Sequence, residues 1–428
     1  MRHYVSETEL SNGARGLFIN VPDASVMTFY ISFRAGEYLV SEDKWEVPHL
    51  MEHLILGANK SYPRGRDFQA DFERNGAYSN ASTSTYDITY EAECADFEWK
   101  RILERMILPL TEPLFLEEEF HAEVGNVKEE LTARSNNHFR HLSLALREAY
   151  GYRSTTYQNR LELIKNVELE DLIDHYKKTH YTSNMRFVIA GKLSPNRRSH
   201  IKSRLSSIEL PGGKGRKKLP IEKPKGLKKP LFISNDTIEN FYFYLDTFMR
   251  RRMSDKELHA MSLVNSMLTE TLHSRILGAA REHGLVYGMN SNIHFDQNCT
   301  NWWFGAQVQP KNASKLFDIM IKEINEVKNG KITRDDLKAA KQYRLGRFQR
   351  DVQTVSGLSA GYMGRYFFED VVEEYTKTPE HIRSVTKSQI VKGANDLFAE
   401  NNWGLGILGG VDRRPANRLA KQISVLWQ

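Results

Sequence analysis

Residues 25–58 read SVMTFYISFRAGEYLVSEDKWEVPHLMEHLILGA, and they join a strand pattern to a helix pattern. The first part, residues 25–36, mixes β-branched and aromatic residues in partial alternation, which is typical of a strand. The last part, residues 47–58, has apolar residues three and four positions apart, which is typical of an amphipathic helix. A strand and a helix that both carry apolar faces need a common core, so this stretch predicts a sheet covered by helices.

Both patterns continue outward from this stretch. A second strand pattern lies at residues 87–94, and helix patterns lie at 97–110, 116–134, 255–277 and 313–330. Strands at the ends of each half, with helices between them, predict the α+β class with mainly antiparallel sheets. At 428 residues the chain is too long for one ordinary core, so we expect at least two domains.

The two halves of the chain carry a faint internal repeat. Segments recur at offsets of 214, 214 and 218 residues: Leu17–Ile19 with Leu231–Ile233, Phe29–Tyr30 with Phe243–Tyr244, and Gly191 with Gly409. A nearly constant offset indicates duplication. Residues 207–230 between the halves are rich in Pro, Gly and Lys, which is typical of a linker. We therefore predict related halves at 1–206 and 231–428, joined by a linker at 207–230.

The positive charge is concentrated in this linker. Residues 214–229 contain eight Lys or Arg and one Glu, a local charge of +7, whereas the whole chain carries +6. The remainder therefore sums to −1, and the segment has no aromatic residues that could stack on bases. We interpret the run as a solvated linker and expect no nucleic-acid partner.

The cysteine count and the apolar pattern limit the class of protein further. Two cysteines, Cys94 and Cys299, support neither a disulfide framework nor a cysteine metal site. Any metal must therefore be held by His and carboxylate side chains. No stretch approaches the roughly 18 uninterrupted apolar residues of a membrane span. The N-terminal residues do not resemble a secretory signal or an organelle presequence, so we expect a cytoplasmic protein.

The segment Pro48-His49-Leu50-Met51-Glu52-His53 has the spacing of a metal site. His49 and His53 lie four residues apart, so on a helix they share one face and can bind one tetrahedral zinc ion. Glu52 can reach the open side of the metal and take a proton from a zinc-bound water that attacks a carbonyl. An HxxEH match also arises by chance in roughly one such sequence in a few tens. The alternative is a pair of surface histidines.

A zinc site needs a third protein ligand, and the acidic helix pattern at residues 117–134 offers candidates. Glu123 and Glu130 are seven residues apart, so both project from one helix face, whereas Glu129 points about 100° away. We assign Glu130 as the third ligand and Glu123 as a carboxylate that orients the site. An acidic run is also typical of a solvated helix face, so the spacing alone leaves this choice open.

The chain resembles the pitrilysin family of metallopeptidases over essentially its whole length. HxxEH is the inverted zinc motif of the inverzincins, and the family's spacing of 76 residues after the second histidine leads to Glu130. A glutamate seven residues before that ligand matches Glu123. Further matching segments are Leu10–Gly13, Asn80–Thr83 and Tyr90. The resemblance is to the short branch, which includes bacterial and mitochondrial processing peptidases, and it implies a clam-shell arrangement of the two halves.

The resemblance also implies substrate-binding residues. In the family the metal-free half supplies an Arg followed by a Tyr, for which Arg281 and Tyr287 are the candidates. A guanidinium and a phenol can hold a peptide backbone or a developing oxyanion. The spacing is six residues instead of the usual seven. Counting from Ser274-Arg275 favours Arg281, whereas counting back from Gly284 places Ala280 at this position. Asn80 and Ala81 resemble the edge strand to which family members add an extended peptide.

The sequence as a whole predicts a zinc-dependent endopeptidase with one Zn²⁺ per chain, acting on peptides or presequences. Family members of this length pair, which implies either a homodimer or a heterodimer with a metal-free sister subunit. The alternative from another class is a structural or assembly subunit that has the fold without the chemistry. A complete set of His49, Glu52, His53, Glu123 and Glu130 favours the enzyme, because a purely structural subunit has no need of it.

Overall fold

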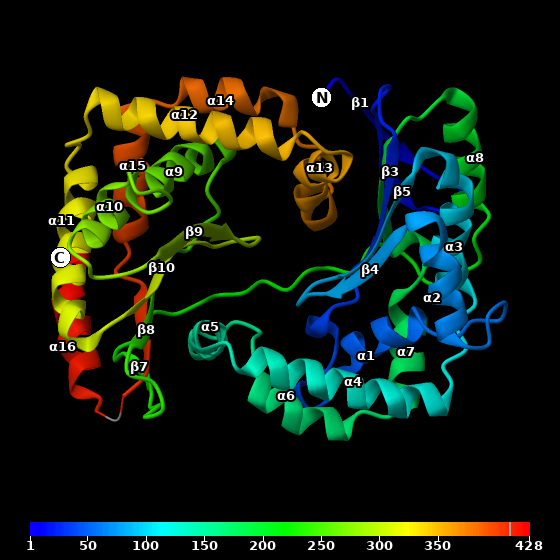
Figure 1. Cartoon of the computed structure of the whole chain (residues 1–428), viewed down its shortest axis with the longest axis horizontal. Helices are drawn as coiled ribbons and strands as arrows, with labels where there is room; N and C mark the ends of the chain where they lie inside the picture. The colour runs from blue at the N-terminus through cyan, green and yellow to red at the C-terminus, as the bar shows by residue number, and fades with distance from the viewer. Residues whose placement is uncertain (411) are drawn as a thin grey trace. The chain divides into compact units, whose positions relative to one another are not determined.

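A computed structural model describes residues 1–410 and 412–428, and the chain forms two compact units (Figure 1). Unit 1 comprises Met1–Thr132, Gln158–Pro220 and Gln349–Tyr375, and unit 2 comprises Ala133–Tyr157, Ile221–Phe348 and Thr376–Gln428. Each unit contains one mostly antiparallel sheet and several helices. The predicted α+β class with two related sheets is confirmed.

Unit 1 has a six-stranded sheet in the order β1-β2-β6-β3-β5-β4. Its strands are β1 (Tyr4–Glu9), β2 (Arg15–Asn20), β3 (Val26–Phe33), β4 (Tyr78–Thr83), β5 (Ile88–Ala95) and β6 (Met185–Gly191). Only β2 and β6 pair in parallel among these neighbours. The helices of this unit are α1 (Val47–Ile55), α2 (Gly65–Glu73), α3 (Trp99–Thr111), α4 (Glu117–Ser135), α6 (Tyr157–Leu163), α7 (Leu169–Thr179), α8 (Pro195–Ser206) and α13 (Val355–Glu369). In the strand order of this sheet, β4 lies at one edge.

Unit 2 has a five-stranded sheet in the order β7-β11-β8-β10-β9. Its strands are β7 (Leu231–Ile233), β8 (Phe241–Met249), β9 (Met289–Phe295), β10 (Thr300–Val308) and β11 (Trp403–Leu408). The helices are α5 (His138–Ala149), α9 (Asp255–Leu268), α10 (Arg275–Glu282), α11 (Pro310–Lys328), α12 (Arg334–Asp351), α14 (Thr378–Ser384), α15 (Lys387–Phe398) and α16 (Arg414–Ile423). Across the described residues of both units, none of the helices has the length and hydrophobicity that crossing a membrane requires.

The strand order repeats between the units, as the sequence offset predicted. Positions β2-β6-β3-β5-β4 of the first sheet match β7-β11-β8-β10-β9 of the second, including the one parallel pair in each. The glycines at the ends of β6 and β11 repeat in conformation, because Gly191 has φ 139° and Gly409 has φ 133°. A Cβ atom would lie 2.9 Å from the Val26 oxygen in one case and 2.9 Å from the Asn240 oxygen in the other. Both positions therefore require glycine for the same reason.

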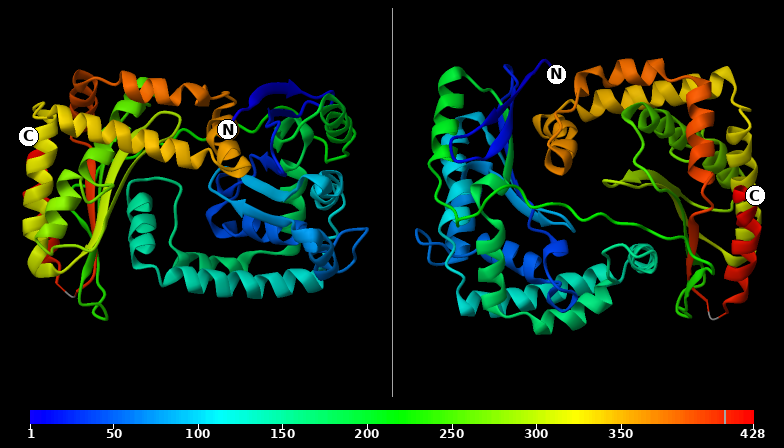
Figure 2. Two further views of the ribbon diagram at one scale, coloured as in Figure 1. Left: turned by 45° about the horizontal axis from the view of Figure 1, so that its top comes forward. Right: turned by 180° about the vertical axis from the view of Figure 1, so that it is seen from behind.

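One helix on each sheet comes from the other half of the sequence. Helix α13 packs on β3 and β6 of unit 1, where Ser359 Oγ lies 2.9 Å from Thr28 Oγ1. Helix α5 packs on β8 and β11 of unit 2, where the rings of Phe139 and Tyr244 lie 5.4 Å apart. Figure 2 shows α13 beside the strands of unit 1 from two further directions. Each compact unit is thus assembled from segments of both sequence halves.

This helix exchange explains why the central strands are buried on both faces. Strand β3 is buried at seven of its eight residues. Alternate side chains point to opposite faces, so Thr28 and Tyr30 meet Ser359 and Ser356 of α13. The odd-numbered residues of β3 point to the opposite face of the sheet, where the Phe33 ring stacks on His180, just after α7.

The helix predicted over residues 255–277 is two helices. Helix α9 ends at Leu268 and α10 begins at Arg275. Between them the Ser274 hydroxyl accepts from the Thr271 backbone N–H at 2.9 Å and donates to the Ser266 carbonyl at 2.6 Å. Ser and Thr hydroxyls that bond to nearby backbone groups compete with helical hydrogen bonds. The apolar spacing did not reveal this competition.

The basic linker is held along its length. The lysines at positions 214, 218, 223, 225, 228 and 229 are exposed, as expected for a solvated segment. The side chain of Arg216 is instead only 7% exposed, and its guanidinium pairs with Asp370 just after α13. Backbone N–H groups of Lys217 and Leu227 donate to Asn184 and Trp403 in units 1 and 2, respectively. The side chain of this arginine thus differs from the solvated lysines around it.

Candidate metal centre

Helix α1 carries the HxxEH residues and is almost completely buried. It packs against α7 and against the edge strand β4. Pro48 lies in the first turn, where the missing N–H has no cost. His49 and Glu52 are buried with the apolar residues of the helix, and His53 is partly exposed. The candidate site residues of α1 thus lie at the rim of a packed core.

His49, His53 and Glu130 form a group that could hold a metal ion. One potential ligand atom from each lies within 4.8 Å of the others. The Glu130 Oε2 atom is 3.6 Å from His49 Nε2 and 3.8 Å from His53 Nε2. Ligands of a tetrahedral zinc ion at about 2.1 Å lie about 3.4 Å from one another. The three side chains therefore fit a zinc ion with little movement.

Each histidine uses its other ring nitrogen for a carboxylate. His49 Nδ1 lies 3.0 Å from Glu46 Oε2, and His53 Nδ1 lies 2.8 Å from Glu123 Oε2. Because an ionised carboxylate only accepts hydrogen bonds, both Nδ1 atoms carry the hydrogen. When the rings are neutral, the lone pairs of both Nε2 atoms therefore face the side of Glu130, which is the arrangement that metal-binding histidines use.

The carboxylates give this group a strong preference for positive charge. Burial lowers the pKa of His49, but hydrogen bonds with Glu130 and Glu46 outweigh burial and raise the pKa to about 9. The hydrogen bond from His53 holds the pKa of Glu123 below its ordinary value. A proton on His49 thus occupies the place of a cation between carboxylates, and a bound metal ion would displace it.

Glu52 lies outside the ligand group and has a partner of its own. The Thr83 hydroxyl, at the end of β4, donates a short hydrogen bond to Glu52 Oε2. Burial raises the pKa of Glu52, while Thr83 and the nearby histidines act in the opposite direction. A buried carboxylate with a raised pKa beside a metal group suits the acceptance of a proton near neutral pH.

Sequence reasoning missed three residues of this centre. Glu46 precedes His49 by three positions, so the helical spacing could have indicated it. Arg160 binds the Glu46 carboxylate from 114 residues away, and no local pattern signals it. Thr83 lies within the quoted segment Asn80–Thr83, but its contact with Glu52 depends on how β4 packs against α1.

The predicted peptide-binding residues of unit 1 lie on β4. The structure places this strand at the sheet edge and pairs it with β5. Asn80 is exposed and its amide lies 3.5 Å from Glu91, whereas Ala81 is buried. Strand β4 therefore belongs to the same unit as the metal group and packs on helix α1.

The predicted substrate-binding residues of unit 2, Arg281 and Tyr287, contact each other. Arg281 donates to the Tyr287 carbonyl at 2.9 Å, and its guanidinium lies 4.8 Å from the centre of the Tyr287 ring. The Tyr287 side chain is otherwise open to solvent, with 90% of its surface exposed. Ala280, at the alternative position, is buried. A binding role for either Arg281 or Tyr287 stays a prediction.

The chain thus combines two α+β units with a candidate metal group, formed by the HxxEH helix α1 and by Glu130 of α4. The family described as Insulinase (Peptidase family M16) matches residues 19–163, and the Peptidase M16 inactive domain matches residues 166–343. The chain belongs to the peptidase M16 family, so the predicted family is confirmed. A comparison with curated proteins finds no match.

Solved structures share the fold at low sequence identity. A protease from Helicobacter pylori is 19% identical with a TM-score of 0.83, covering 95% of this chain and 100% of its own. A peptidase M16 inactive domain from Pseudomonas fluorescens is 17% identical with a TM-score of 0.82, at 96% and 98% coverage. A protein described as an M16-like peptidase from Alicyclobacillus acidocaldarius is 16% identical with a TM-score of 0.78, at 95% and 98% coverage.

Proposed function

We propose that the chain is a zinc-dependent endopeptidase whose ion is held by His49, His53 and Glu130. The convergence of two Nε2 atoms on one carboxylate oxygen, at 3.6 and 3.8 Å, is the observation that carries this proposal. Glu46 and Glu123 support it, because they leave both Nε2 lone pairs free. Membership of the peptidase M16 family makes a peptide the expected substrate.

Each residue of the centre has a separate role in the proposed peptide hydrolysis. A bound zinc ion supplies a Lewis acid that acidifies water and polarises the scissile carbonyl. Glu52 accepts the proton of the attacking water and returns it to the leaving amine. Thr83 orients the Glu52 carboxylate through its hydrogen bond. Glu123 orients His53 through its hydrogen bond to Nδ1.

The edge strand β4 provides a place for the substrate. An extended peptide that adds to the free edge would form backbone hydrogen bonds with β4, and Asn80 and Ala81 lie on that strand. Because Thr83 of the same strand contacts Glu52, a peptide on this edge runs close to the catalytic carboxylate. Arg281 and Tyr287 are the proposed contacts from unit 2.

The test measures zinc content and cleavage of a quenched fluorescent peptide for matched variants. Glu52→Gln should retain zinc and lose activity by roughly 10³-fold, within the range for general acid–base catalysis. Glu130→Gln should lose both zinc and activity. Glu129→Gln is the matched control, because Glu129 is the exposed neighbour of Glu130 on α4. Cleavage that survives both zinc chelation and Glu52→Gln would overturn the proposal.

The same preparation tests the assembly. The short-branch resemblance implies a homodimer, or a heterodimer with a metal-free sister subunit. A purified chain that binds zinc but cleaves nothing, and gains activity with a co-purified partner, would identify the heterodimer. Failure of the pure chain to bind zinc would instead favour a structural or assembly subunit of the same fold.

A further inference from the structure

The two metal-facing histidines have unequal carboxylate partners. The side chain of Glu46, which binds His49, is 0% exposed, whereas that of Glu123, which binds His53, is 28% exposed. Asn126 donates the additional side-chain hydrogen bond to Glu123, at 3.2 Å. The orientation of His49 is thus fixed inside the protein, and that of His53 is fixed where solvent has access.

The Glu46 carboxylate is held by a guanidinium on both oxygens. Arg160, on α6, donates from Nε to Oε1 and from Nη2 to Oε2, the latter at 2.9 Å. Two parallel hydrogen bonds of this kind fix the plane of the carboxylate as well as its position. On its other side Arg160 Nη1 lies 3.7 Å from Glu37 Oε1. A buried series Glu37–Arg160–Glu46–His49 therefore leads to the metal-facing ring.

Burial of these charged side chains costs desolvation free energy, and a gain in stability alone does not explain it. Buried ion pairs are often no more stabilising than well-packed apolar residues of the same volume. The Glu46 carboxylate at the end of the series contacts Arg160 on one side and His49 Nδ1 on the other. Because Nδ1 is used in this way, Nε2 is the ring atom of His49 that is left to face a cation. The arrangement therefore points to a role in orienting His49 toward a cation.

We propose that Glu46, locked by Arg160, is the positioning residue that keeps the hydrogen of His49 on Nδ1 and aims Nε2 at Glu130. In this position it sets the affinity of the centre for its ion. The identity of that ion as zinc rests on the proposed function. Glu46 touches neither substrate nor the reacting atoms, and it acts only through His49.

The experiment compares zinc affinity, measured by competition with a chromogenic chelator, between wild type and variants. Glu46→Gln keeps the shape and an acceptor for Nδ1 but removes the charge. It should weaken zinc binding by about 10- to 100-fold, the usual effect of losing an orienting partner. Glu123→Gln is the matched comparison and should weaken binding less, because Glu123 is partly solvated. Cleavage at saturating zinc should retain the wild-type KM.

Two further variants cover the case in which Glu46→Gln fails to fold with Arg160 unpaired. The double variant Glu46→Gln/Arg160→Met removes both charges, and it should fold with the same weakened zinc affinity. Arg160→Lys keeps the charge but cannot hold both carboxylate oxygens, so it should show a smaller loss. The melting temperature of each metal-free variant reports on the fold separately from the metal.

The visible absorption of the Co²⁺-loaded protein gives a readout that a purely structural role would not change. The proposal expects an altered cobalt spectrum together with weaker zinc binding in Glu46→Gln or the double variant. Wild-type affinity and spectrum in these variants, or a loss of affinity that only parallels a loss of metal-free stability, would overturn it. Absence of zinc binding in the wild type would overturn the proposed function as well, so the two failures are distinguishable.

Discussion

Helices α1 and α9 are corresponding elements of the duplicated fold, and their buried faces differ. Helix α1 packs on α7 of unit 1, and α9 packs on α15 of unit 2. The inner face of α1 presents His49 and Glu52, whereas that of α9 buries apolar residues such as Met261 and Val264. The strand order is the same in both units. The corresponding helix of unit 2 thus has the same place in the fold without a buried ionisable residue.

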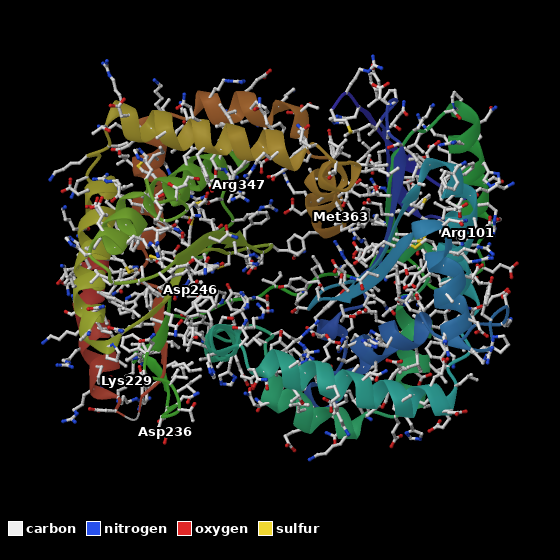
Figure 3. The ribbon with its side chains drawn as sticks, in the orientation of Figure 1. Arg101, Lys229, Asp236, Asp246, Arg347 and Met363 are labelled. Carbon is white, nitrogen blue, oxygen red and sulfur yellow. The ribbon has the colours of Figure 1, made fainter. Side chains whose placement is uncertain are left out.

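Helices α4 and α12 differ even more in charge. Each precedes the helix that joins the sheet of the other sequence half. Helix α4 has six carboxylates and two cationic residues, and α12 has six cationic residues and three carboxylates. Arg347 of α12, labelled in Figure 3, pairs with Glu270 at 3.8 Å. An acidic helix that carries Glu130 and a basic helix thus occupy the same place in the element order.

The largest expected difference between the units is their response to zinc removal. A ligand that binds only the folded state stabilises it by about 4 kcal/mol at a concentration 1,000 times its dissociation constant. Because the ligand group lies in unit 1, chelation should increase amide hydrogen exchange in α1 and α4 and leave the sheet of unit 2 unchanged. Hydrogen exchange with mass spectrometry measures both regions in one sample. An equal increase in hydrogen exchange in the sheets of both units would contradict a zinc site that belongs to unit 1.

The next largest difference is in the response to pH. Asp246 on β8, labelled in Figure 3, is buried, and this burial raises its pKa to about 7 despite a 2.7 Å hydrogen bond from Asn301. The folded state then binds more protons than the unfolded state between pH 4 and 7, so stability falls as pH rises through that range. The offset of 214 places Ser32 at the corresponding position of β3, without a charge.

Asp246→Asn should therefore stabilise the protein at pH 8 and have little effect at pH 4. Each unit of pKa shift corresponds to about 1.4 kcal/mol, so the gain is at most about 4 kcal/mol. Urea unfolding followed by tryptophan fluorescence at both pH values measures it. Ser32→Ala is the matched control, and it should leave the pH dependence unchanged. A pH dependence that persists in Asp246→Asn would show that another group causes it.

The repeated glycines should have equal costs of substitution in the two units. Gly191→Ala and Gly409→Ala each force a side chain into a positive φ and against a carbonyl oxygen at 2.9 Å. We expect each to lower the free energy of unfolding by about 2–3 kcal/mol. Gly76→Ala is the control, because Gly76 has φ 79° but no atom within 4 Å of the added Cβ, so about 1 kcal/mol is expected. Clearly unequal costs at Gly191 and Gly409 would weaken the structural repeat.

Local patterns in the sequence predicted some of the strands and helices of each half. The strand at 25–36 and the helix at 47–58 form β3 and α1, and the repeat offset predicted equivalent strands in the two sheets. The exchange of α5 and α13 was not predictable in this way. Its contacts join residues such as Thr28 and Ser359, which are 331 positions apart, and neither helix has a pattern that identifies its partner sheet.

The metal group was predictable because its two motifs are local. His49 and His53 share one helix turn, and the family spacing identified Glu130. The structure brings these three together. The residues that hold the surrounding carboxylates were harder to predict from the sequence, because Arg160 contacts Glu46 and Thr83 contacts Glu52 only through tertiary packing. Glu46 is the exception, because its i, i+3 relation to His49 was readable.

The smallest expected effect concerns how the exchanged helices are held. Ser359 on α13 is buried, lies 2.9 Å from Thr28 Oγ1 and donates to the Val355 carbonyl. Ser359→Ala leaves the Thr28 hydroxyl without this partner, so it should cost about 1 kcal/mol, measured by urea unfolding. Ser356→Ala should cost less, because its bond to the Tyr30 hydroxyl is longer, at 3.2 Å, and only partly buried. If the two variants cost the same, burial of the hydrogen bond is not what holds α13 on the sheet, and its apolar contacts with β3 and β6 carry the attachment as the aromatic contacts of α5 do in unit 2.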